Sequence, residues 1–204
     1  MENMLHMGHM PTSLLETLER EIGSLKLTEA FSWEDASGRQ RKTFEFGVIF
    51  REIERTGQMV RTPVPAWLAQ ARTHLVALFQ AHLSEKDPEK YENCIITIYR
   101  AGDGIKRHTD RAYFGPDVLG IIVQPDQAAD PAHPPAALTF CKPRSAEVVA
   151  LPEHKGMAFL FQGALRQTWE HELSPVHTGR IAVQFRTVLD DKIRQNSHWN
   201  YLPT

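Results

Sequence analysis

The stretch at 98–114, IYRAGDGIKRHTDRAYF, has a glycine-containing turn followed by His108 and Asp110, two positions apart. Residues i and i+2 of a strand lie on the same face, so both side chains can point to one place. A neutral imidazole and a carboxylate suit Fe, Mn or Zn. On its own, the pair fits an ordinary polar hairpin as well as two ligands of a metal site.

A second polar segment lies at 167–186, QTWEHELSPVHTGRIAVQFR. It contains His171 and His177, followed by a strand pattern with Arg180 and Arg186 six residues apart. Even spacing places both arginines on one face of the strand and the apolar residues between them on the other. Buried arginine requires an anion, and a guanidinium can hold a carboxylate bidentately. A solvated outer face would explain the two arginines equally well.

The elements that must position these residues are mostly short strands. Six segments rich in Val, Ile and Phe are separated by Gly, Pro and Asp turns, which is typical of an antiparallel sandwich or barrel: 94–100, 118–124, 137–143, 147–152, 156–163 and 180–189. Helical spacing of Leu and other apolar residues predicts helices over 12–25 and 64–83, and KTFEFGVIF at 42–50 alternates like a strand. The sequence therefore predicts one α+β domain, with N-terminal helices packed on a C-terminal β-sandwich.

Composition restricts the function classes. The net charge of −2 gives no overall attraction to nucleic acid or to an anionic membrane. Two distant cysteines, Cys94 and Cys141, argue against a disulfide scaffold or a thiolate zinc site. No apolar run approaches the roughly 20 residues of a membrane span, and the first residues lack the pattern of a signal peptide. We expect a cytoplasmic or nuclear protein with no membrane partner.

Residues 93–188 resemble the AlkB-like branch of the Fe(II)- and 2-oxoglutarate-dependent dioxygenases. The resemblance lies in TIYRAGDGIKRHTD, WEHELSP and RIAVQFR, which match the H-x-D, distal-His and arginine-strand motifs of that family. It implies a double-stranded β-helix (jelly-roll) core over 93–189. The same resemblance implies N-terminal helices and a substrate lid over 1–92, and a tail over 190–204, in a single domain of residues 1–204.

The resemblance also implies the ligand sets. Iron would be held by His108, Asp110 and His171, with His177 less suited because it lies in a PVHTG turn. The cosubstrate 2-oxoglutarate, used together with O2, would meet the residues that match the family motifs: Arg180 at its far carboxylate, Arg186 at its near carboxylate or beside Asp110, and Tyr99 and Thr97 as further hydrogen-bonding groups. Three of these motif positions depart from the family: Thr97 stands where Asn is common, and Ala182 and Gln184 replace Asn and Thr.

The lid implied by the resemblance is GRQRKTFEFGVIF at 38–50. Phe44 and Phe46 would stack on a base, with Arg41 and Lys106 among the cations that contact phosphates. Core packing of the two rings and a solvated face for the cations are the alternatives. The implied activity is oxidative demethylation of a modified nucleic acid, RNA or single-stranded DNA. Ala112 stands where bacterial repair members carry an acidic residue, so the same chemistry on a protein, lipid or small molecule remains open, as does a catalytically silent binding module.

Overall fold

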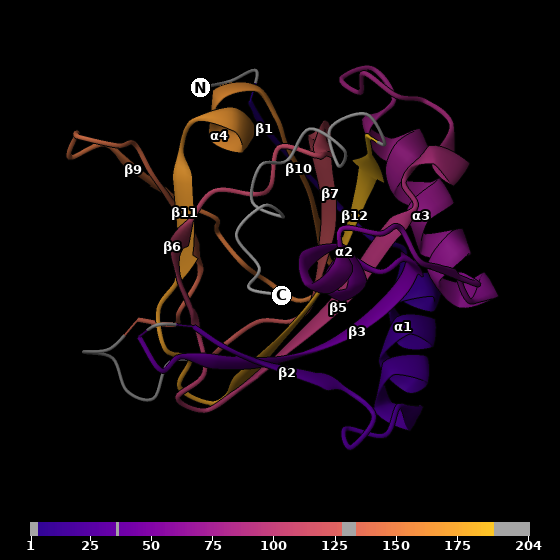
Figure 1. Ribbon diagram of the computed structural model, residues 1–204, viewed down its shortest axis with the longest axis horizontal. Helices are drawn as coiled ribbons and strands as arrows, with labels where there is room; N and C mark the ends of the chain where they lie inside the picture. Colours follow the sequence, from indigo (N-terminus) through magenta and orange to yellow (C-terminus); the bar gives the residue numbers. More distant parts are fainter. Residues whose placement is uncertain (1–3, 36, 128–133, 190–204) are drawn as a thin grey trace.

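Two antiparallel sheets form the framework of the computed structural model, which describes residues 4–35, 37–127 and 134–189 (Figure 1). The major sheet has the strand order β1-β10-β7-β12-β5-β3-β2, with β4 also paired to β3. Its strands are β1 (Leu5–His9), β2 (Phe31–Glu34), β3 (Gln40–Val48), β4 (Arg61–Thr62), β5 (Asn93–Arg100), β7 (Phe114–Gln124), β10 (Met157–Phe161) and β12 (Gly179–Val188).

The minor sheet has the order β6-β11-β8-β9. It consists of β6 (Ile105–His108), β8 (Leu138–Cys141), β9 (Val148–Ala150) and β11 (Glu170–Leu173). The helical elements are α1 (Thr12–Ser24), α2 (Phe50–Thr56), α3 (Ala66–Phe79), α4 (Gly163–Gln167) and the short 3-10 turn η1 (Pro88–Lys90). The chain has the double-stranded β-helix (jelly-roll) fold with few helices, as the sequence predicts.

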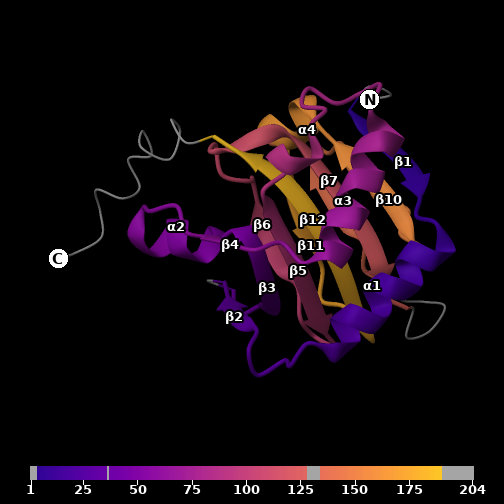
Figure 2. The same cartoon turned by 90° about the vertical axis from the view of Figure 1, so that its right-hand side faces the viewer.

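Helices α1 and α3 cover the outer face of the major sheet (Figure 2). Leu18 of α1 and Leu75 of α3 pack there with Val183 and Phe185 of β12. The inner face of the same sheet, including Ala182, packs against the minor sheet in a second apolar cluster. Because both faces are covered, β7 and β12 are buried along most of their length.

The alternation of side chains along β12 determines where its arginines point. The odd-numbered residues of β12 face the helices, so Arg180 and Arg186 face the space between the two sheets and are 4% and 5% exposed. The alternative of a solvated outer face for these arginines is therefore wrong.

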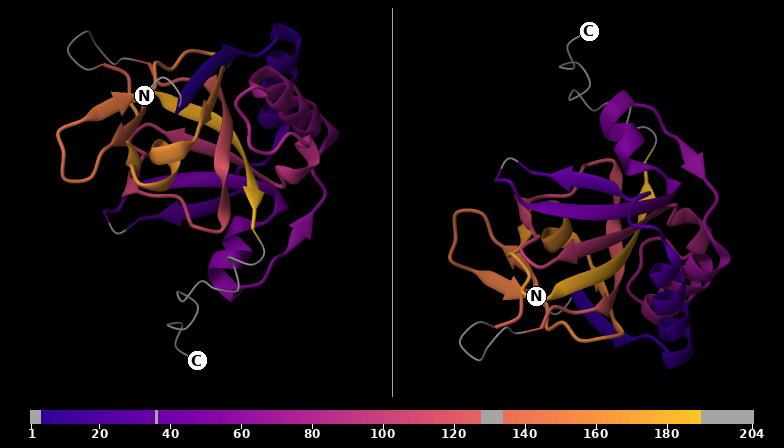
Figure 3. Two further views of the ribbon diagram at one scale, coloured as in Figure 1. Left: turned by 90° about the horizontal axis from the view of Figure 1, so that it is seen from above. Right: turned by 90° about the horizontal axis from the view of Figure 1, so that it is seen from below.

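The N-terminal third is continuous with the core sheet. Strand β3 pairs with β5 from Lys42↔Ile98 to Gly47↔Asn93. Figure 3 shows β2 and β3 reaching across toward the minor sheet. There the backbone N–H of Lys106 donates to Asp35 (2.8 Å) and that of Gly104 to the carbonyl of Gln40 (3.1 Å). This hairpin therefore closes one side of the space between the sheets.

Near the N-terminus, Leu5–His9 form strand β1, which pairs with β10. The expected tail at 190–204 lies outside the described residues. Within 4–35, 37–127 and 134–189, no helix combines the length and apolar character that crossing a membrane would require.

Candidate metal centre

His108, Asp110 and His171 meet at the edge of the minor sheet. His108 ends β6, Asp110 follows two residues later, and His171 lies on β11 directly opposite His108 in the antiparallel register. Each residue offers one ligand atom, and these atoms lie within 4.8 Å of one another. The two imidazole rings have a centroid separation of 4.4 Å. Pairing of β6 with β11 thus brings together two segments that are far apart in the sequence.

The donor atoms fit a cation. Nδ1 of His108 lies 2.8 Å from the carbonyl oxygen of Lys106, and a proton on that nitrogen leaves Nε2 as a free donor for a metal. Oδ2 of Asp110 and Nδ1 of His171 are buried and have no hydrogen-bond partner among the described residues. Buried polar atoms are rarely left unpaired, so these two atoms are suited to meet a bound metal ion. Two imidazoles and one carboxylate form the donor set of non-heme Fe(II) sites.

Electrostatics keep Asp110 charged and His171 neutral. Burial raises the pKa of Asp110, but Arg186 (3.4 Å), the two histidines and Arg166 (3.9 Å) together hold it well below its usual range. Burial lowers the pKa of His171 to about 4. A metal requires an ionised carboxylate and neutral imidazoles, so this centre is ready to bind near neutral pH.

His177 lies outside the cluster. Its Nδ1 is 3.0 Å from Oδ2 of Asp126, a fully buried carboxylate near the end of β7. The structure therefore places His171, rather than His177, beside His108 and Asp110.

A cavity of about 290 Å³ opens beside the three candidate ligands. All four predicted cosubstrate residues line it: Thr97 and Tyr99 from β5, and Arg180 and Arg186 from β12. The inward face of β5 and the inward face of β12 lie side by side, since Arg180 pairs with Tyr99 and Ala182 with Thr97 in the register. The structure thus brings all four residues beside the candidate metal ligands, and their role toward a cosubstrate stays a prediction.

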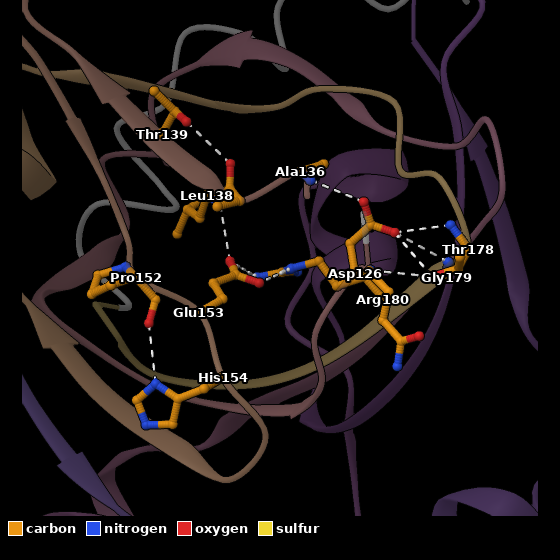
Figure 4. A network of polar contacts seen from close by, with 12 residues as sticks. Asp126, Ala136, Leu138, Thr139, Pro152, Glu153, His154, Thr178, Gly179 and Arg180 are labelled. Atoms are coloured by element: carbon orange, nitrogen blue, oxygen red, sulfur yellow. Dashed lines mark hydrogen bonds and ion pairs between the residues drawn. The ribbon is translucent and has the colours of Figure 1, made fainter. Parts of the chain in front are cut away.

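Arg180 differs from expectation because it is already paired. Its Nε and Nη2 donate to the two oxygens of Glu153, both at 2.7 Å (Figure 4). The two side chains are 4% and 3% exposed. Oε1 of Glu153 also accepts the backbone N–H of Leu138 (2.9 Å). Arg180, which was expected to meet the far carboxylate of 2-oxoglutarate, is therefore already part of a buried ion pair with Glu153.

The predicted aromatic platform is wrong. Phe44 belongs to the core beneath α1 and α3, and Phe46 packs edge-on against Trp67. Neither lines the cavity, because the opposite face of β3, which carries Arg41 and Thr43, points into it. Of the two predicted cations, Arg41 lines the cavity and Lys106 does not.

Comparisons with known proteins define the fold. No protein-family model matches the sequence, and no curated protein matches it. Similar solved structures include a prolyl hydroxylase from Trichoplax adhaerens in complex with a hypoxia inducible factor oxygen degradation domain peptide fragment. That structure has a TM-score of 0.63 and 15% identity over 96% of this chain and 88% of that chain. A Pseudomonas putida prolyl-4-hydroxylase has a TM-score of 0.60 and 14% identity, over 91% of this chain and 92% of that chain.

At these identities the likeness establishes the double-stranded β-helix fold. Both neighbours are prolyl hydroxylases, so membership of the AlkB-like branch stays a prediction from the motifs.

Several residues in or beside the cavity were missed from the sequence. Trp33, Glu45 and Glu54 line it, Glu153 pairs with the lining residue Arg180, and Arg166 lines a neighbouring pocket that also contains Asp110. Glu45 alternates with Phe44 and Phe46 on β3. The alternation therefore indicated a strand with two faces, but the face with the two phenylalanines was expected at the substrate instead of the face with Glu45. Arg166 is 5% exposed and donates to three carbonyl oxygens, of Arg111, Phe114 and Gly115. No local pattern distinguishes it from a surface arginine.

Proposed function

We propose that the protein is an Fe(II)- and 2-oxoglutarate-dependent oxygenase. One observation carries the proposal: His108, Asp110 and His171 converge on one point, two of them with unpartnered buried donor atoms, inside a prolyl-hydroxylase-like fold. Prolyl hydroxylases belong to this same superfamily of oxygenases. When bound, the iron and its cosubstrate supply the activation of O2 that replaces a substrate C–H hydrogen with a hydroxyl group.

The chain supplies position, charge and exclusion of water. Arg186 lies 3.4 Å from Oδ1 of Asp110 and keeps this carboxylate ionised, so that the Oδ2 atom stays available to the metal. Phe140 and Phe161, with ring centroids 5.9 and 5.8 Å from that of His171, shield the imidazole from solvent. Thr97, Tyr99 and Arg186 line the same cavity and are suited to hold the keto acid.

We propose a polypeptide side chain as the substrate. A solved neighbour of the same fold is described with a bound peptide. The rings expected to stack on a nucleobase, Phe44 and Phe46, are instead core residues. Demethylation of RNA or single-stranded DNA therefore lacks the support that the sequence resemblance suggested, and the protein-substrate alternative is favoured.

The test is oxidation of 2-oxoglutarate to succinate by purified protein with Fe(II) and ascorbate. Asp110→Ala, prepared in parallel, is the control for contaminating activity. A peptide library and methylated RNA and DNA oligonucleotides are then compared by mass spectrometry. We expect a peptide to gain one oxygen atom.

Release of formaldehyde from an oligonucleotide would instead identify a demethylase. Binding of metal and 2-oxoglutarate without any succinate would identify a silent binding module. Absence of metal and cosubstrate binding would exclude the oxygenase.

A further inference from the structure

Asp110 lies between two strands, in a segment that strand pairing does not hold. Strand β6 ends at His108 and β7 begins at Phe114, and residues 109–113, which the structure describes, belong to neither sheet. The register of β7 against β12 is also irregular just beyond this segment, between Phe114 and Val118. Strand pairing alone therefore does not fix the carboxylate that lies beside the two histidines.

Arg166 of α4 holds this segment through its backbone. Its Nη2 donates to the carbonyl oxygens of Arg111 and Phe114, both at 2.8 Å, and its Nε donates to that of Gly115 at 3.1 Å. The side chain is buried, so water competes little for these hydrogen bonds. Because a guanidinium presents its donors in one rigid plane, a single arginine can fix three carbonyl groups at once.

The same guanidinium faces the carboxylate of Asp110 without bonding to it. Its Nε lies 3.9 Å from Oδ2 of Asp110, which is beyond hydrogen-bonding distance, and this is its one ion pair within the described part of the chain. The Nε proton is already used by the carbonyl oxygen of Gly115. Arg166 therefore supplies positive charge beside Asp110 and leaves Oδ2 available as a donor atom.

Arg166 also connects two segments that carry candidate ligands. It lies five residues before His171 in the chain. Between them, the backbone N–H of Trp169 donates to the carbonyl oxygen of Ala164 (2.9 Å), and the Trp169 side chain packs in the apolar cluster between the two sheets. Through Arg166, the segment that follows Asp110 is therefore bound to the segment that leads into His171.

We propose that Arg166 is a positioning residue for the metal centre: its hydrogen bonds to residues 111–115 hold Asp110 beside His108 and His171. The inference rests on the proposed function, because it concerns the same centre. Arg166 touches no metal ion itself and acts only through Asp110. A metal ion gains affinity from this contact, since the carboxylate is held in place before the ion binds.

The test compares the Mn(II) affinity of the metal-free wild type with that of Arg166→Ala by calorimetry. We expect the affinity to fall about 10- to 100-fold, as for loss of a group that supports a metal ligand. Guanidinium chloride at millimolar concentration, well below the range that unfolds proteins, should restore part of the affinity. The free ion can reach the vacated place through the polar pocket that Arg166 lines together with Thr109 and Gln167.

The matched control is Arg72→Ala. Arg72 is also buried and also donates to a backbone carbonyl oxygen, that of Tyr91 (3.4 Å). It lies on α3, which covers the outer face of the major sheet, away from the metal centre. This variant should unfold at lower urea concentration than the wild type, but its Mn(II) affinity should be unchanged with and without guanidinium.

Wild-type Mn(II) affinity in Arg166→Ala would overturn the inference. An equal loss in Arg166→Ala and Arg72→Ala, without rescue by guanidinium, would overturn it as well, because the cause would be general destabilisation. If Arg166→Ala does not fold, Arg166→Lys replaces it: an ammonium group lacks the planar fork, so the affinity should still fall, and wild-type affinity in this variant would refute the role. A wild type that binds no Mn(II) would refute the proposed function itself, which is a different result.

Discussion

Asp110 illustrates how single residues build the centre. Its Oδ1 lies near Arg186 and its Oδ2 is 3.9 Å from the guanidinium of Arg166, while two imidazoles lie on its other side. The charges of the two arginines keep this carboxylate ionised, and its Oδ2 accepts no hydrogen bond from the described residues. The residue therefore has the charge and the open lone pairs of a metal ligand.

Substitution should distinguish the three candidate metal ligands from His177. His108→Ala, Asp110→Ala and His171→Ala should each lower Mn(II) affinity by more than the roughly 10- to 100-fold expected for loss of a supporting group. His177→Ala is the matched control and should bind like the wild type, because its ring contacts Asp126 instead. Calorimetric titration of metal-free protein gives the affinities. Loss of binding in His177→Ala with retention in His171→Ala would reverse the assignment.

Strand β3 contributes one face to the hydrophobic core and the other to the cavity beside the candidate metal ligands. Its even-numbered side chains, Phe44 and Phe46, pack toward the helices, and its odd-numbered ones, Arg41, Thr43 and Glu45, line the cavity. Alternation along a strand makes this division unavoidable. A change on one face should therefore affect stability, and a change on the other should affect the reaction.

Two neighbouring substitutions test this division. Phe44→Ala should lower the free energy of unfolding by about 3 to 5 kcal/mol, because it opens a cavity in the core. Glu45→Gln keeps the side-chain volume and the acceptor for the Arg51 N–H, and should cost no more than about 1 kcal/mol. Urea unfolding measures both. A large loss of stability in Glu45→Gln with little in Phe44→Ala would contradict the assignment of faces.

Asp126 joins the loops that lead into β8 and β12. Its buried carboxylate accepts the backbone N–H groups of Ala136 (2.9 Å), His177 (2.9 Å) and Thr178 (2.9 Å). Burial raises the pKa of Asp126, but these hydrogen bonds outweigh it and hold the pKa well below the ordinary value of 3.8. The folded state therefore favours the ionised form.

This shift predicts an acid-sensitive contribution to stability. The unfolded chain takes up the proton first as pH falls, so the stabilisation is complete above about pH 4 and is lost progressively below it. Asp126→Asn should cost roughly 2 to 3 kcal/mol at pH 7, and the difference from wild type should shrink as pH falls from 4 toward 2. Chemical unfolding at several pH values measures this difference. A difference that stays constant over this range would refute the role of the charge.

At the scale of the whole molecule, β1 completes the major sheet. Leu5–His9 pair with the fully buried apolar strand β10 along its length. Without β1, the backbone groups on that side of β10 would be unpaired and its edge would be open to a second chain.

Deletion of residues 1–9 should therefore cause self-association or precipitation. Light scattering after size-exclusion chromatography would detect it, with the wild type measured alongside. The double variant His6→Ala with His9→Ala is the control, because it changes side chains but keeps the backbone pairing, and it should match the wild type. A truncated chain with the wild-type mass and stability would show that β1 is dispensable.

The sequence by itself determined the local features: the order His108, Asp110, His171, the single face shared by Arg180 and Arg186, and the positions of the main strands and two helices. These depend on spacing and periodicity, which neighbouring residues define. It also predicted the double-stranded β-helix, through motifs that each lie within one short segment.

The tertiary structure alone decided which face of β3 lines the cavity and that Glu153 pairs with Arg180. Alternation gives a strand two faces but does not say which one the helices cover. An ion pair between residues 27 positions apart exists only when the fold brings a loop against a strand.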